Sequence, residues 1–294
     1  MKKLLSLVCA LVLCLSLVPA VAEQAAYVET VISIPNGDHE IPATVCVPAG
    51  EGKFPAVVML HGTASNRAEA GNGYKMAAPV LAEKYGIATI RIDFMGNGDS
   101  TADYMGYTFD SAVGDAVAAA NYMKEQANID AEKIGVMGWS QGGTDALLAC
   151  AWHPDIFKSI VTWAGAPSMV LDGFFTEELY AEAKANGFFT MTFDWRTPLN
   201  VSLEWCEDVM TTDVLAEFAA YTGPVLAVHG TADVTVDPEW SNKIVAANTN
   251  AASKTFFIEG MDHTFNVFTE IEAGYPALYS AVDATGAFFA ETLK

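Results

Sequence analysis

Residues 134–150 read IGVMGWSQGGTDALLAC and place one serine between a strand-like run and a helix-like run. The apolar run IGVM is typical of a strand inside a parallel sheet, and TDALLAC is typical of a buried helix. Residues 138–142 fit the pattern G-x-S-x-G, whose glycines leave room for a sharp turn that exposes the serine hydroxyl. The pattern also arises by chance in glycine-rich turns, but its place between strand and helix favours Ser140 as a nucleophile.

A serine nucleophile needs a histidine base within hydrogen-bond reach and a carboxylate that orients that base. His263 lies just after the last apolar run of the chain, in a loop that can reach the carboxyl edge of a sheet. Asp233 follows the preceding apolar run by a short loop at the same edge. Asp262 and Asp237 are rival carboxylates. The order Ser140, Asp233, His263 is the chain order in which enzymes with a G-x-S-x-G turn carry their triad.

Apolar runs of the buried, parallel-sheet kind recur along the chain and alternate with helical stretches. Two earlier segments, 26–34 and 40–48, alternate polar and apolar residues around Asn36-Gly37 and predict an antiparallel hairpin. Alternating strands and helices with right-handed crossovers predict an α/β fold with a mostly parallel central sheet and helices on both faces. The buried runs cover residues 56–60, 87–92, 134–137, 159–164, 224–228 and 254–258.

Together these motifs resemble the α/β-hydrolase-fold serine hydrolases. The resemblance covers nearly the whole chain after the first 22 residues and is carried by VVMLHG, RIDFMGNGDS, GWSQGG, HGTADVTV and DHTF. Within this fold they look most like the cinnamoyl/feruloyl esterases and their serine-aminopeptidase-like relatives. Trp139 departs from the pattern, because many of these esterases carry histidine at that position.

The resemblance implies a role for each residue of the site. Ser140 resembles the nucleophile, His263 the general base and then acid, and Asp233 the carboxylate that orients the imidazole. The main-chain N–H groups of Thr63 and Gln141 resemble the oxyanion hole. Because these donors belong to the main chain, their side chains are expected to matter little.

Three further polar residues near these motifs are expected to be structural. His61 precedes the glycine of the oxyanion loop and is expected to shape that loop. Asp93 and Asp99 are expected to order the loop RIDFMGNGDS beside the site.

A long excursion at 165–221 interrupts the alternation and predicts a cap inserted over one end of the sheet. The expected organisation is a leader at 1–22, a core at 23–164 and 222–294, and this cap between the two parts of the core. The cap is rich in aromatic residues, which either line a substrate site or fill a small core of their own. The candidate substrate contacts among them are Phe174, Phe175, Phe188, Phe189, Trp195 and Trp205.

The first residues have the pattern of a secretory signal peptide. Lys2 and Lys3 precede an apolar stretch at 4–18, and small residues follow at 20–22. The apolar stretch is short for a membrane span. We expect cleavage near Ala22 and a location outside the cytoplasm, extracellular or periplasmic; an uncleaved anchor is the alternative.

The chain has 36 acidic and 15 basic residues among its 294, a net charge of −21. Such a surface repels nucleic acid and anionic lipid, so neither nucleic acid nor, once the signal is removed, a membrane is expected as a partner. The composition leaves the oligomeric state open.

Cysteine spacing and the known ligand motifs suggest no bound group. Cys46, Cys150 and Cys206 remain after the leader, and an odd number without close pairs indicates neither a disulfide framework nor a zinc site. Buried free thiols are favoured for Cys46 and Cys150, with one disulfide left open. No H-E-x-x-H, P-loop or dinucleotide-binding pattern is present, so no cofactor or metal is expected.

These expectations combine into a secreted carboxylic-ester hydrolase that works through an acyl-enzyme, of the feruloyl/cinnamoyl type that acts on hydroxycinnamate esters of plant cell walls. Its substrate would be a small-molecule or polysaccharide-linked ester. The alternatives are a general short-chain acyl esterase, a serine peptidase of the aminopeptidase-like branch, and a non-catalytic binding protein. In the peptidase, acidic cap residues would bind a free amino terminus; these are Glu177, Glu178, Glu182, Glu204, Glu207 and Asp208.

Overall fold

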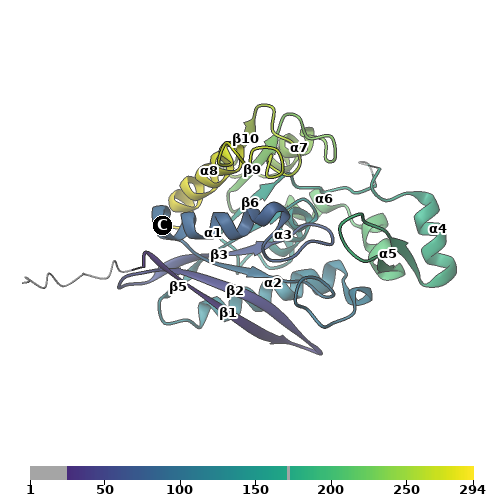
Figure 1. Ribbon diagram of the computed structural model, residues 1–294, viewed down its shortest axis with the longest axis horizontal. Helices are drawn as coiled ribbons and strands as arrows, with labels where there is room; N and C mark the ends of the chain where they lie inside the picture. The colour runs from purple at the N-terminus through teal and green to yellow at the C-terminus, as the bar shows by residue number, and fades with distance from the viewer. Residues whose placement is uncertain (1–24, 171–172) are drawn as a thin grey trace, which may run out of the picture.

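A computed structural model describes residues 25–170 and 173–294, so the expected signal peptide at 1–22 lies outside the described residues. The described residues form an eight-stranded sheet in the order β1-β2-β4-β3-β5-β6-β9-β10 and a two-stranded sheet, β7-β8, beside it (Figure 1). The strands are β1 (Tyr27–Asn36), β2 (His39–Pro48), β3 (Phe54–Leu60), β4 (Ala88–Ile92), β5 (Ile129–Trp139), β6 (Ser159–Trp163), β7 (Phe188–Met191), β8 (Leu199–Ser202), β9 (Val225–Gly230) and β10 (Lys254–Ile258).

The large sheet is parallel except at its first two strands. β1 and β2 form the expected antiparallel hairpin, with Asn36 opposite His39, and Gly37 supplies the positive φ of 62° that the tight turn requires. β2 pairs antiparallel with β4, and every later pair in this sheet is parallel. The predicted α/β fold with a mostly parallel sheet is confirmed.

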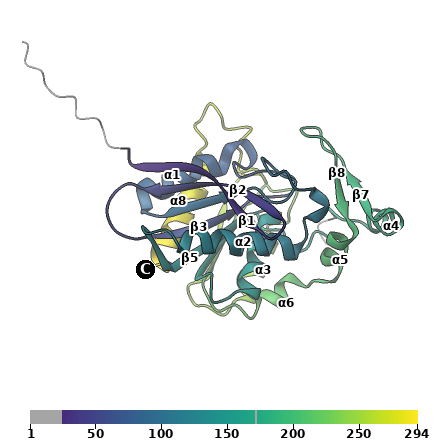
Figure 2. The same cartoon turned by 90° about the horizontal axis from the view of Figure 1, so that it is seen from below.

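Helices cover both faces of the sheet and bury two separate apolar cores (Figure 2). On one face α1 and α8 pack through residues such as Tyr74 and Leu278; on the other, α2 and α3 pack through residues such as Ala116 and Leu147. The helices are α1 (Gly73–Tyr85), α2 (Phe109–Lys124), α3 (Gln141–Trp152), α4 (Glu177–Asn186), α5 (Leu203–Thr211), α6 (Val214–Phe218), α7 (Glu239–Ala247) and α8 (Pro276–Thr292).

The segment between β6 and β9 projects from one side of the molecule, where α4, α5 and the β7–β8 hairpin lie together in both views (Figures 1 and 2). This projecting part has an apolar centre of its own. Phe175 and Trp205 meet edge to face at 5.5 Å, and Phe189 packs against Phe175 at 5.7 Å between ring centroids.

The described cysteines, Cys46, Cys150 and Cys206, are free and buried. Burial raises the pKa of the Cys46 and Cys206 thiols to about 12, and it raises the pKa of Cys150 as well. Over residues 25–170 and 173–294, no helix has the length and apolar character that crossing a bilayer requires.

Candidate active site

Ser140 occupies a strained turn between β5 and α3. Its φ of 55° and ψ of −120° lie where residues with a side chain are rare. The flanking glycines are sterically required, because a Cβ on Gly138 would lie 1.8 Å from the Gly142 carbonyl oxygen and one on Gly142 would lie 2.2 Å from the Leu60 oxygen. The chain therefore folds into a nucleophile elbow that presents the serine hydroxyl above the carboxyl edge of the sheet.

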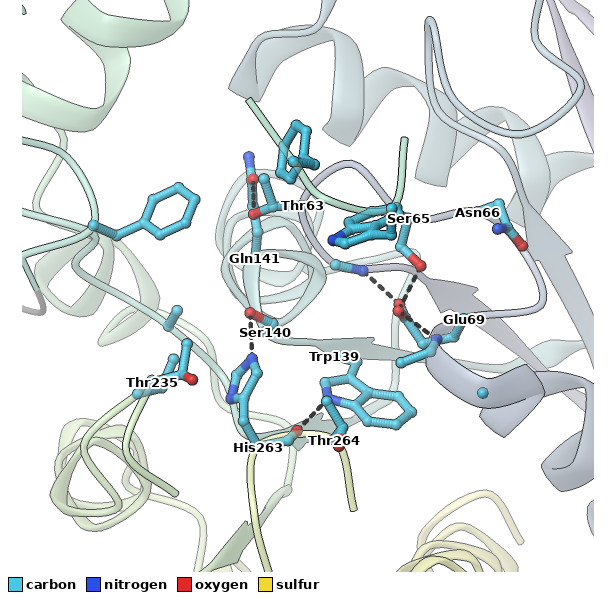
Figure 3. Close-up of a pocket in the computed structure, with 18 of the residues that line it drawn as sticks. Thr63, Ser65, Asn66, Glu69, Trp139, Ser140, Gln141, Thr235, His263 and Thr264 are labelled. Atoms are coloured by element: carbon cyan, nitrogen blue, oxygen red, sulfur yellow. Dashed lines mark hydrogen bonds between the residues drawn. The ribbon is translucent and has the colours of Figure 1, made fainter. Parts of the chain in front are cut away.

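Three side chains from different loops form one hydrogen-bonded chain. The Ser140 hydroxyl lies 3.1 Å from Nε2 of His263 (Figure 3). On the other side of the ring, Nδ1 of His263 lies 2.8 Å from Oδ2 of Asp233. A carboxylate oxygen can only accept, so Nδ1 carries the proton and Nε2 is free to accept from the serine. The structure thus brings together the three residues that the sequence predicted as a triad.

Asp233 is held by more donors than its triad partner alone. Oδ1 accepts from the main-chain N–H groups of Thr235 and Val236, and Oδ2 accepts from both His263 and His229, the latter at 3.0 Å. Burial would raise the pKa of Asp233, but the hydrogen bonds from His229 and His263 outweigh it and hold that pKa well below its usual range. Asp233 is therefore ionised at neutral pH, where it orients His263.

His229 is a buried residue of the site whose importance the sequence did not reveal. Its Nε2 faces two acceptors, Asp233 Oδ2 and the Val236 carbonyl, so it must carry a proton. Its Nδ1 lies 2.8 Å from the buried hydroxyl of Ser241, which completes the ring's hydrogen bonds. The adjacent sequence HGTAD could have signalled it, since the two side chains stand four positions apart on one tight loop.

Trp139, the residue that departs from the esterase pattern, anchors the histidine loop. Its indole N–H donates to the main-chain oxygen of His263 at 3.0 Å. Its ring packs edge to face on Phe265 at 4.7 Å and on Trp163 at 5.4 Å. An imidazole lacks this apolar area, so tryptophan here ties the loop that carries the base to the strand that carries the nucleophile.

The two expected oxyanion donors are free. Within residues 25–170 and 173–294, neither the Thr63 N–H nor the Gln141 N–H has an acceptor. Gln141 opens α3, where main-chain N–H groups have no helical partner and the helix dipole favours negative charge. Both residues line the cavity that holds Ser140. This is the arrangement that an oxyanion hole requires.

Glu69 is a second residue that the sequence analysis missed. Its carboxylate is buried and accepts from the Gly62 N–H at 2.6 Å, the Ser65 hydroxyl at 2.6 Å and the Ala70 N–H at 2.8 Å. Its own φ is +62°, an unusual value for a glutamate. Glu69 thus fixes the loop that carries Thr63 (Figure 3).

The three polar residues expected to be structural do hold loops together. His61 Nδ1 donates to the Gly62 oxygen at 2.8 Å, its Nε2 accepts from the Phe94 N–H at 3.2 Å, and burial lowers its pKa. Asp93 and Asp99 both bind Arg67, and Asp93 also accepts from the Asp99 N–H. None of the three lines the cavity at Ser140.

Ser140 and His263 open into a cavity of about 590 Å3 with largely apolar walls. Its size falls within the range of small-molecule sites. The described lining residues include one carboxylate, Glu69, besides the imidazole of His263. The aromatic part of the wall consists of Phe174, Phe193, Trp195, Phe268 and Trp139.

Only two of the six aromatic cap residues expected at the substrate site reach this cavity, namely Phe174 and Trp195. Phe175, Phe189 and Trp205 are buried in the small core of the cap, which corrects the expectation for them. Phe188 does not line the cavity either; it precedes Phe189 on β7, and neighbouring strand residues point to opposite faces. Phe193, which was not singled out, does line it.

The acidic cap residues lie away from the cavity. None of Glu177, Glu178, Glu182, Glu204, Glu207 and Asp208 is among its described lining residues. Asp208 instead accepts from the Phe109 N–H at 2.9 Å, at the start of α2. In this structure they form no amine-binding site at Ser140.

The sequence profile of the prolyl oligopeptidase family (peptidase family S9) matches residues 73–266, which include Ser140, Asp233 and His263. The chain belongs to this family. Among curated relatives, 2,6-dihydropseudooxynicotine hydrolase of Paenarthrobacter nicotinovorans is 33% identical over 147 residues, which span 46% of this chain and 36% of that protein. An uncharacterized 31.7 kDa protein of Escherichia coli is 29% identical over 121 residues, 39% of this chain and 40% of its own. These matches thus span well under half of each relative.

Solved structures of α/β-hydrolases share the fold of this family member over nearly their full length. Est1E from Butyrivibrio proteoclasticus, solved with ferulic acid bound, superposes with a TM-score of 0.72 at 23% identity and covers 89% of this chain and 99% of its own. A putative hydrolase from Agrobacterium vitis S4 superposes with a TM-score of 0.70 at 21% identity and covers 90% and 99%. The chain therefore has the α/β-hydrolase fold.

Proposed function

We propose that this protein is a serine esterase that cleaves carboxylic esters through an acyl-enzyme, with hydroxycinnamate esters such as feruloyl esters as its substrate class. The observation that carries the proposal is the hydrogen-bonded chain Ser140–His263–Asp233 opening into an apolar cavity with aromatic walls. A flat aromatic acyl group suits such walls, because aromatic rings pack well against one another.

Each step of the reaction has a residue in place. Ser140 Oγ attacks the ester carbonyl carbon while its proton passes to Nε2 of His263, 3.1 Å away. The negative charge that develops on the carbonyl oxygen is taken up by the Thr63 and Gln141 N–H groups. His263 then returns the proton to the departing alkoxide, and a water activated by the same nitrogen releases the acid from Ser140.

A second candidate is a serine peptidase, because the chain belongs to the prolyl oligopeptidase family. A peptidase that recognises a free amino terminus needs a carboxylate near the nucleophile. The six acidic cap residues do not line the cavity, and Glu69 already accepts three hydrogen bonds from its own loop. These contacts favour the ester reaction.

The test has two parts. A fluorophosphonate probe should label the purified wild-type protein and fail to label Ser140→Ala, whereas Ser280→Ala, on α8 away from the cavity, should label normally. The kcat/KM values for methyl ferulate, p-nitrophenyl acetate and an alanyl anilide then rank the three substrate classes. A higher kcat/KM for the anilide would favour the peptidase over the esterase. A wild-type protein that the probe does not label would contradict the serine mechanism.

We also propose that the protein is exported and works outside the cytoplasm. The support is the basic, apolar and small-residue pattern of residues 1–22. The intact mass of protein expressed with its leader should correspond to a chain that begins close to Glu23. Recovery of only full-length protein in the membrane fraction would support an uncleaved anchor instead.

A further inference from the structure

We propose that the side chains of Thr63 and Gln141, through the hydrogen bond between them, hold the two oxyanion donors in place. The Thr63 hydroxyl donates to Oε1 of Gln141 at 2.6 Å (Figure 3). The same two residues carry the free main-chain N–H groups described above. This inference rests on the serine-hydrolase chemistry of the proposed function and is independent of its feruloyl specificity.

The bond connects two parts of the chain that are distant in sequence and lie side by side where the paired strands β3 and β5 end. Thr63 lies in the loop after β3, and Gln141, 78 positions later, is the first residue of α3. Loops move more than the elements they join, so the loop donor can drift relative to the helix donor. A side-chain bond between these very residues couples the positions of their N–H groups directly.

The remainder of the loop is held from other directions. Glu69 accepts from the Gly62 N–H on one side of Thr63, and Arg196 of the cap donates to the Ala64 oxygen on the other side. These contacts hold the residues before and after Thr63. Within the described residues, the bond to Gln141 is the one hydrogen bond of the Thr63 side chain, so it sets the orientation of this residue.

Apart from its bond to Thr63, the Gln141 side chain is unfavourable for stability at its position. Its side chain is fully buried, and Nε2 has no hydrogen-bond partner in the described part of the chain. A buried, unpaired amide group lowers stability, whereas a methionine of similar length would bury no amide. A glutamine kept at such a site points to a function for its oxygen, and that oxygen accepts from Thr63.

The experiment measures kcat and KM for p-nitrophenyl acetate in Thr63→Val, Thr63→Ser, Gln141→Met and the double variant Thr63→Val/Gln141→Met. Thr63→Val should lower kcat about tenfold with KM changed less than about threefold, since a displaced donor acts on the transition state. Thr63→Ser, which keeps the hydroxyl, should retain most of kcat. Gln141→Met should lower kcat while its Tm stays level or rises, and the double variant should be no slower than the slower single variant.

Thr89→Val is the matched control, because Thr89 is fully buried on β4 and its hydroxyl has no partner among the described residues. It makes the same chemical change away from the site and should leave kcat within twofold. Equal losses in Thr63→Val and Thr63→Ser, additive losses in the double variant, or a kcat of Thr63→Val within twofold of wild type would each overturn the inference. A wild type that cleaves p-nitrophenyl acetate but no feruloyl ester would overturn only the proposed specificity, and one that cleaves no ester would overturn both.

Discussion

Asp145 is a buried carboxyl group on α3, beneath the nucleophile. One of its oxygens accepts from the Tyr107 hydroxyl at 2.7 Å, and the other has no partner in the described chain. Burial raises the pKa of Asp145 to about 8, with the nearby Asp115 adding to the rise. The folded chain therefore binds a proton that the unfolded chain releases, so this group's contribution to stability is full below about pH 4 and is lost as the pH rises through about 8.

Asp145→Asn should remove this pH dependence, because the amide stays neutral throughout. The free energy of unfolding of the wild type should fall from pH 5 to pH 8 by up to about 1.4 kcal/mol per pH unit from this group alone. The variant should lack that part of the decline. Urea titrations of both proteins at pH 5, 6.5 and 8 measure it, and parallel pH profiles would show that Asp145 is ionised in the fold.

The residues that the sequence could identify are those with a local motif. Ser140 is marked by flanking glycines, and Asp233 and His263 by their places after apolar runs. Glu69 carries no such mark, and His229 is marked only by its place four residues before Asp233. Their roles come from contacts with Gly62 and Asp233 that depend on how loops fold over one another, and those contacts are not encoded in spacing.

Among the elements, the elbow between β5 and α3 tolerates least change. Gly142→Ala would place a methyl group 2.2 Å from the Leu60 oxygen, and main-chain atoms on both sides cannot move apart cheaply. We expect a loss of at least about 3 kcal/mol of stability or failure to fold. Thermal unfolding and the yield of soluble protein compare Gly142→Ala with the wild type.

Gly114→Ala is the matched control for the elbow. Gly114 lies within α2, and a Cβ there would meet only the Asn36 side chain at an ordinary 3.8 Å. Alanine is the better helix former, so this change should stabilise the protein by up to about 1 kcal/mol. Gly142→Ala should lower the free energy of unfolding and Gly114→Ala should raise it. Equal changes in the two variants would refute the steric explanation.

The β7–β8 hairpin carries Phe193 and Trp195 to the cavity, and Arg196 at its tip joins it to the core. The guanidinium donates to the Ala64 oxygen, to Asn97 Oδ1 at 2.9 Å and to the Gly96 oxygen at 3.4 Å. Partial burial lowers the pKa of Arg196, and no carboxylate among the described residues forms an ion pair with it.

Arg196→Met should loosen the hairpin and thereby the wall of the cavity. We expect KM for a feruloyl ester to rise by roughly threefold to tenfold, which corresponds to a loss of about 1 kcal/mol from the hydrogen bonds of this charged group. The kcat for p-nitrophenyl acetate should change much less. Lys184→Met serves as the control, because this cap lysine lies over the ring of Tyr180 on its own helix, 4.0 Å from the ring centroid. An equal effect of both changes on KM would argue against the role of Arg196 in joining the hairpin to the core.

The central strands were predictable because each contains a short run rich in apolar residues, and the six expected runs overlap β3, β4, β5, β6, β9 and β10. β5 begins earlier than expected, at the buried Ile129, because the partly or fully exposed residues 130–133 separate Ile129 from the apolar run. The direction of the cap aromatics was not predictable. Composition reports how many rings a segment has, but Phe175 and Phe189 turn inward only because α4, α5 and the hairpin enclose them.

At the scale of the whole molecule, the negative net charge should affect thermal stability. A net charge of −21 means that the folded surface repels itself at neutral pH, and added salt screens that repulsion. The Tm at pH 7.5 should therefore rise by ~2–4 °C between 10 mM and 200 mM NaCl. Near the isoelectric point of about 4.4 the rise should vanish, and a rise of equal size there would assign it to some other effect of salt.

The described cysteines have a consequence for where this chain can fold. Cys46, Cys150 and Cys206 each lie in a different element, buried and unbridged, and burial raises the pKa of each thiol. Protonated, enclosed thiols neither exchange with disulfides nor oxidise readily. The folded state should thus be insensitive to redox potential: once folded, a leaderless chain in a reducing cytosol and an exported chain in oxidising surroundings should have the same active structure.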